Sequence, residues 1–125
     1  MRTRLLVVSL AVPLTFGACS SGESGDDQAD RQVTFEATEY SFPGMQGFNA
    51  RQGERVEFVM TNHGALEHEF QVLSSGTQVG VIEPVPPGAA GRVTVTFEKT
   101  GSYRYFSDIA DHATRGPRGT FTVVS

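Results

Sequence analysis

The chain has 125 residues, which is too short for two ordinary domains, and a formal net charge of −4. No basic stretch follows the first few residues, so we expect no nucleic-acid partner. The single cysteine excludes an intrachain disulfide, a cysteine-based zinc site, an iron–sulfur cluster and a CxxC redox motif. With 14 Gly, 9 Phe and no Trp, the composition favours a small β-rich domain with many turns.

The N-terminus has the order of a secretory signal peptide: a basic start, the apolar run LLVVSLAVPLTF, two small residues and then Cys19. The run is too short to span a bilayer as a stable helix. A cysteine after a small pair resembles a lipobox, where a bacterial signal peptidase cleaves and the new N-terminal cysteine is lipidated. We therefore expect residues 1–18 to be a lipoprotein signal peptide, with Cys19 lipidated. A buried core cysteine is the alternative.

Residues 19–31 contain no large apolar side chain and include an acidic tract. Such a segment cannot offset the entropy of ordering, so we expect a flexible linker. The folded domain is then predicted over residues 32–125. The expected location is extracytoplasmic, with the chain anchored to the bacterial cell membrane through its lipid, or simply secreted.

Within that domain, apolar residues alternate with polar ones in six segments, separated by turn signals such as Pro43-Gly44 and Ser75-Gly76. This period of two predicts half-buried strands and an all-β Greek-key β-sandwich of six to eight strands. The alternating residues are Val33, Phe35 and Ala37; Val56, Phe58 and Met60; Phe70 and Val72; Val93, Val95 and Phe97; Tyr103 and Tyr105; and Phe121 and Val123.

Three histidines suggest a metal site. His63 lies in a turn, His68 starts the strand HEFQV, and His112 lies in the loop between the last two strands. Two imidazoles at strand ends can converge at one pole of a sandwich, and imidazole nitrogen suits Cu(II), Zn(II) and Ni(II). We expect His68 and His112 to form the site, whereas His63 is expected to be an exposed turn residue.

Segments 37–42, 50–72 and 100–124 resemble a cupredoxin. In that family a strand ending in Asn precedes a loop and a His ligand, and Asn62 and His68 occupy those positions. The family's C-terminal pattern is G-x-Y-x-Y-x-C-x(4)-H-x(4)-M-x-G. It is matched here at Gly101, Tyr103, Tyr105, His112 and Gly119.

Two family ligands are missing: Ser107 stands where the thiolate Cys belongs, and Pro117 stands where the axial Met belongs. A blue-copper site needs the thiolate, and a serine alkoxide is too basic to replace it at neutral pH. The resemblance therefore implies a colourless site of nitrogen and oxygen ligands, which suits Cu(II) first and Zn(II) second. A fast electron carrier is not expected.

Asp111 directly precedes His112 and is the first choice for a third ligand, with Asp108 as another nearby carboxylate. Glu67 and Glu69 flank His68, so on a strand they point to the opposite face.

Two other chemistries are less favoured. Met60 alternates with core residues and is expected to pack, whereas Met45 stays a weak candidate for a thioether ligand. Ser107, Asp108 and His112 are the residue types of a hydrolytic triad, but no nucleophile elbow or oxyanion hole accompanies them. We therefore expect no enzyme.

A closer resemblance is to the cupredoxin-like domain of EfeO-type iron-uptake lipoproteins. The matching segments are Ala65–Glu69, the Pro87-Gly88 turn and Pro117–Gly119. This resemblance implies metal handling at the cell surface, alone or with a recruited metal-transport or redox protein. The predicted function is thus binding of a divalent metal, Cu(II) first, for trafficking or buffering. The alternative is a metal-free interaction or structural module.

Overall fold

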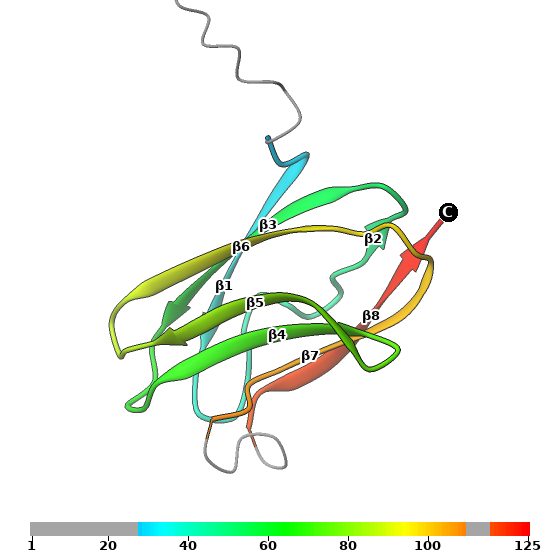
Figure 1. Ribbon diagram of the computed structural model, residues 1–125. Coiled ribbons are helices and arrows are strands. Elements are labelled where there is room, and N and C mark those ends of the chain that lie inside the picture. Colours follow the sequence, from blue (N-terminus) through cyan, green and yellow to red (C-terminus); the bar gives the residue numbers. More distant parts are fainter. Residues whose placement is uncertain (1–27, 110–115) are drawn as a thin grey trace, which may run out of the picture.

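The computed structural model describes residues 28–109 and 116–125, which form two packed β-sheets (Figure 1). One sheet has three strands in the order β1-β3-β6, and the other has five in the order β2-β8-β7-β4-β5. The predicted all-β sandwich is confirmed. The strands are β1 (Arg31–Ala37), β2 (Ala50–Arg51), β3 (Arg55–Asn62), β4 (His68–Ser74), β5 (Thr77–Val85), β6 (Ala90–Thr96), β7 (Gly101–Phe106) and β8 (Arg118–Val124).

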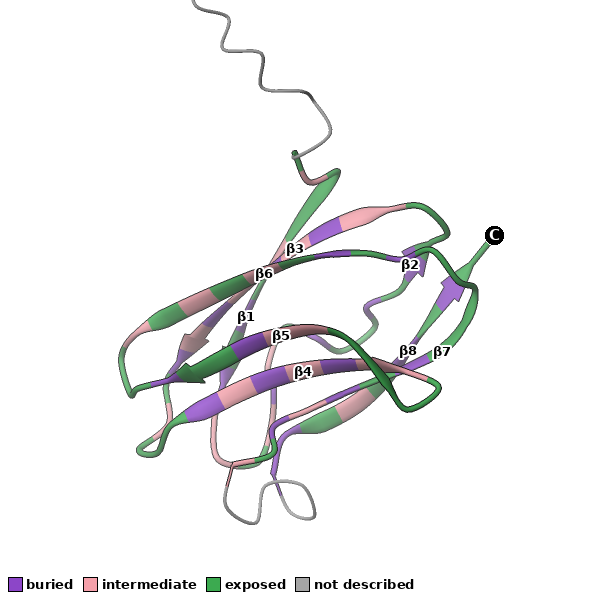
Figure 2. Cartoon of the chain, in the orientation of Figure 1, coloured by how far each residue is buried: buried purple, intermediate pink, exposed green. Residues whose placement is uncertain are grey.

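Alternation of side chains puts one face of each sheet into the core, as the striped burial in Figure 2 shows. Strand β3 is the clearest case, since Val56, Phe58 and Met60 are fully buried and their neighbours are only partly so. β3 pairs in parallel with β1 and antiparallel with β6. In the other sheet, β4 pairs antiparallel with both β5 and β7, and β7 pairs antiparallel with β8.

Aromatic rings fill the space between the sheets. Phe35 of β1 and Phe70 of β4 come from opposite sheets, and their ring centroids are 4.7 Å apart. Phe58 lies 5.4 Å from Phe70 and 6.2 Å from Phe97. Each ring of this size removes a large apolar area from water, so these contacts hold the two sheets together.

Two strands were not among the segments predicted from alternation. β2 has only two residues, too few for a period to show. In β5 the buried residues Ile82 and Val85 are three apart, because the pairing with β4 shifts register between His68 and Phe70. Pro84 is tolerated there because β5 is an edge strand. Within the described ranges, no helix has the length and hydrophobicity needed to cross a membrane.

Several strand ends meet at one pole of the sandwich, at the lower left in Figure 1. Strands β1 and β7 end there, and strands β4 and β8 begin there. The backbone N–H of Ser107 donates to the carbonyl of Pro117, 3.1 Å away, which joins the segments that follow β7 and precede β8. This pole carries the candidate site.

Candidate functional site

Asn62 fixes the loop that leads to the candidate ligand His68. Its side chain is buried, and its Nδ2 donates to the carbonyl oxygens of Leu66 at 2.7 Å and Val85 at 2.8 Å. Its Oδ1 accepts from the N–H of Gly64 at 2.8 Å. One side chain thus ties both ends of the 63–67 loop and the end of β5 together. This explains why the chain needs an amide here, with donors and an acceptor at once.

His68 begins β4, as predicted, and its imidazole is completely buried at the pole. Its Nε2 lies 3.6 Å from Oε1 of Glu39, which follows β1. Glu39 is partly exposed, so the pair lies where the buried core meets solvent. The structure therefore brings the carboxylate of Glu39 next to His68. Glu39 was not among the ligands predicted from the sequence.

Gly64 lies against this pair and leaves space for it. A Cβ atom built on Gly64 would lie 2.8 Å from His68 Nε2 and closer still to Glu39 Oε1, which are distances that real Cβ atoms do not show. Only glycine leaves room for the imidazole and the carboxylate to approach each other here. The absence of a side chain at position 64 is thus part of the architecture of the site.

Glu39 is held in its ionised form. The backbone N–H of Ala65 is the largest influence that lowers the pKa of Glu39 below its ordinary value. The N–H of Leu66 and the His68 imidazole lower the pKa further, against an opposing effect of desolvation. Because both N–H groups donate to Oε1, the carboxylate also anchors the 63–67 loop.

Ser107, at the position of the family thiolate, is fully buried beside β4. Its hydroxyl oxygen accepts a long hydrogen bond of 3.4 Å from the N–H of Glu69. The Glu69 carboxylate in turn accepts from the N–H of Asp108 at 2.9 Å and from Nε2 of Gln71 at 2.8 Å. Glu69 is therefore engaged with the backbone after β7, away from His68.

The other predicted residues fall into three groups. His63 is exposed over 56% of its side chain, as expected for a turn residue, and lies 3.5 Å from Glu36. Met45 and Met60 both belong to the hydrophobic core. His112, Asp111 and Cys19 lie outside the described residues, so the predicted convergence of His68 with His112, the ligand role of Asp111 and the lipidation of Cys19 stay predictions.

The described donors fit part of a divalent metal site. Neighbouring ligands at about 2.0 Å are about 3.3 Å apart around a tetrahedral ion and about 2.8 Å apart around a tetragonal one, so the 3.6 Å between Glu39 and His68 must shorten by less than about 1 Å. Imidazole and carboxylate suit Cu(II) or Zn(II). Among residues 28–109 and 116–125, however, no group of three or more His, Cys, Asp or Glu side chains could hold an ion. A complete site needs a further ligand.

Sequence reasoning missed Glu39 because it lies in the TEY segment after β1, far from either histidine in the sequence. The parallel register of β1 with β3 places Ala37 beside Asn62 and so brings the loops after both strands together. The one available signal was that Thr38–Phe42 lies within the first family-like segment, which carries a single carboxylate, Glu39.

Comparison with known proteins agrees with this architecture. The family model described as the cupredoxin-like domain matches residues 6–123. Among solved structures, the dithionite-reduced auracyanin of Roseiflexus castenholzii is 14% identical, with a TM-score of 0.66 over 78% of this chain and 100% of that one. Auracyanin B is 14% identical, with a TM-score of 0.67 over 79% of this chain and 92% of that one.

The copper nitrite reductase of Nitrosomonas europaea is 24% identical, with a TM-score of 0.57 over 74% of this chain and 41% of that one. At these identities the structural matches establish the fold alone. No curated protein sequence matches the chain. Because the family model spans nearly its whole length, this chain belongs to the cupredoxin-like domain family, whose fold it shares with copper proteins.

Proposed function

We propose that the protein binds a divalent metal ion, Cu(II) in the first place, as cargo in a non-blue site for trafficking or buffering. The observation that carries this proposal is the buried imidazole of His68 beside the ionised carboxylate of Glu39, in a space that Gly64 keeps open. Support also comes from the copper proteins that share the fold. His112 is proposed as the second imidazole, and Asp111 and Glu39 as carboxylate ligands.

The donor set explains why the site would be non-blue. Ser107 occupies the thiolate position, and the only cysteine of the chain is Cys19. Nitrogen and oxygen ligands stabilise Cu(II) over Cu(I) and give no intense thiolate-to-copper absorption. The residues would bind and release the ion, and no catalytic step is proposed.

Calorimetric titration of the purified protein with Cu(II) and Zn(II), together with electron paramagnetic resonance of the copper form, tests this proposal. We expect a colourless one-to-one Cu(II) complex that His68→Gln abolishes and Glu39→Gln weakens. His63→Gln is the matched control, because it removes an exposed imidazole only five residues from His68. Equal Cu(II) affinity of the His63 and His68 variants would show that His68 is not a ligand and would contradict the proposed site.

A metal-free interaction module is the second candidate function. It is favoured by the fully buried Ser107 at the thiolate position and by the lack of a three-residue ligand group among the described residues. Absence of any binding heat from the unmodified protein, with circular dichroism showing that it is folded, would select this alternative.

We also propose that Cys19 is lipidated and anchors the protein outside the cytoplasm, where it would meet a metal-transport or redox partner. The supporting observation is the basic start, apolar run and small residues that precede Cys19. Fatty-acid labelling that is lost in Cys19→Ala, with release of the protein from the membrane fraction, is the expected result. Unlabelled, soluble protein in both forms would contradict it.

A further inference from the structure

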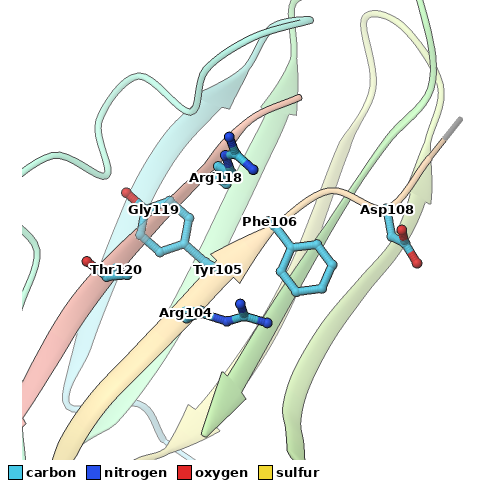
Figure 3. Close-up of a pocket in the computed structure, with 7 residues that line it drawn as sticks. All are labelled: Arg104, Tyr105, Phe106, Asp108, Arg118, Gly119 and Thr120. Carbon is cyan, nitrogen blue, oxygen red and sulfur yellow. The ribbon is translucent and has the colours of Figure 1, made fainter. Parts of the chain in front are cut away.

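A second candidate binding site lies on the outer face of the five-stranded sheet. A groove of about 570 Å³ runs along β7 and β8 and is lined by Arg104, Tyr105, Phe106, Asp108, Arg118, Gly119 and Thr120 (Figure 3). Its volume is within the range of small-molecule sites. It involves neither His68 nor Glu39.

The pairing of the two strands puts both arginines on this face. Phe106 lies directly opposite Arg118, and Arg104 lies directly opposite Thr120. Residues opposite each other, or two apart along a strand, share a face, so Arg104 and Arg118 are diagonal neighbours with Phe106 between them. The Arg104 guanidinium is 5.9 Å from the centre of the Phe106 ring, and Figure 3 shows the two side by side.

No described carboxylate lies within ion-pair distance of the two arginines, although Asp108 also lines the groove. Across residues 28–109 and 116–125, no ion pair within 4.0 Å involves Arg104 or Arg118. The carboxylate of Glu69, one strand away, is already engaged with Gln71 and with the backbone of Asp108. The two guanidinium groups therefore lie on neighbouring strands without a described carboxylate within 4.0 Å, although Asp108 and Glu69 carry negative charge nearby.

Tyr105 and Gly119 also line the groove, but they alternate with the outer-face residues, and the Tyr105 ring packs in the core. Tyr105 is buried, and a Cβ atom on Gly119 would collide with its hydroxyl. The hydroxyl of Thr120, opposite Arg104 on the outer face, can donate a hydrogen bond to an anion. The groove thus combines two guanidinium groups, one hydroxyl donor and one phenyl ring, with the Asp108 carboxylate beside them.

We propose that this groove binds a small organic anion, in which a carboxylate is attached to a planar apolar group. The guanidinium groups of Arg104 and Arg118 match the planar geometry of a carboxylate, and the Phe106 ring offers a surface for the planar body. Inorganic phosphate would use the charges but not the ring, and a neutral aromatic compound would use the ring but not the charges.

Titration of the isotopically labelled protein with phthalate, benzamide and inorganic phosphate, followed by nuclear magnetic resonance, tests the proposal. We expect phthalate to shift the arginine Nε–H signals of Arg104 and Arg118 and the amide signals of β8. Benzamide and phosphate should bind at least about tenfold more weakly, because each lacks one of the two recognition elements.

Arg104→Gln and Arg118→Gln are each expected to raise the dissociation constant for phthalate at least about tenfold, since each removes a charge-assisted hydrogen bond. Phe106→Leu should weaken phthalate but leave phosphate unchanged. Arg92→Gln is the matched control, because Arg92 is 67% exposed on the other sheet and reaches only to 4.0 Å from Glu57. Far-UV circular dichroism establishes that each variant is folded.

Three results would overturn the proposal. Unchanged phthalate affinity in both Arg104 and Arg118 variants would show that the groove is not the site. An affinity for phosphate equal to that for phthalate would show that the Phe106 ring does not contribute to recognition. Shifts produced by an acidic peptide but not by phthalate would reassign the face to protein docking.

Discussion

The side chain of Asn62 offers the sharpest test of how the pole is built, through the substitution Asn62→Ala. Asn62 is buried and makes three hydrogen bonds, to Gly64, Leu66 and Val85, all between 2.7 and 2.8 Å. Alanine removes all three and leaves the Val85 carbonyl without this donor in the interior.

The expected loss of stability follows from these three bonds. A buried hydrogen bond contributes about 1 kcal/mol net, so the substitution should lower the free energy of unfolding by about 3 kcal/mol. Asn49→Ala is the matched control. Asn49 is exposed, and its side-chain oxygen accepts one hydrogen bond, from the N–H of Thr122 at 3.1 Å. We expect about 1 kcal/mol for the control.

Urea denaturation followed by far-UV circular dichroism measures both values. With a slope of roughly 1–3 kcal/mol per molar urea, Asn62→Ala should shift the midpoint down by about 1–3 M without changing the slope. A loss for Asn62→Ala equal to or smaller than the loss for Asn49→Ala would refute the reasoning, because the number of hydrogen bonds would then not set the cost.

Three further predictions concern the site, the core and the pH response. Gly64→Ala should lower Cu(II) affinity at least about tenfold in calorimetry while the protein stays folded, because the new Cβ displaces Glu39 or His68; unchanged affinity would contradict the proposed site. Phe58→Ala should cost about 3–5 kcal/mol in urea denaturation, because Phe58 is fully buried against four rings; a loss below about 1 kcal/mol would be inconsistent with this core. Desolvation raises the pKa of Tyr105 above its ordinary value of 10.0, so its contribution to stability is complete below pH 10 and is lost as the pH rises through the folded-state pKa. Tyr105→Phe should therefore flatten the alkaline fall of the unfolding free energy, and identical pH profiles for the two proteins would exclude this cause.

The strands that the sequence predicted are those whose burial keeps a strict period of two. In β3, alternate residues from Val56 to Met60 enter the core, and the pattern is visible directly. In β5 the register shift opposite Phe70 changes the spacing of buried residues, so the strand cannot be read from alternation. A bulge depends on the partner strand, and a single segment carries no information about its partner.

The candidate site divides in the same way. His68 was predicted at the start of its strand, because both the family-like spacing after Asn62 and the alternation after it are local. Glu39 was not, because its approach to His68 depends on how the loop after β1 folds over the loop after β3. The role of Gly64 depends on its contacts in space with Glu39 and His68, which the neighbouring sequence does not specify.

Local chemistry therefore determined the all-β class, the turns and the absence of a thiolate in the folded domain, since each is a property of residue type and short spacing. Tertiary structure alone decided that Glu39 lies beside His68 and that Arg104 and Arg118 share one face. Both arrangements join residues through strand pairing, in which contact is set by register rather than by distance along the chain.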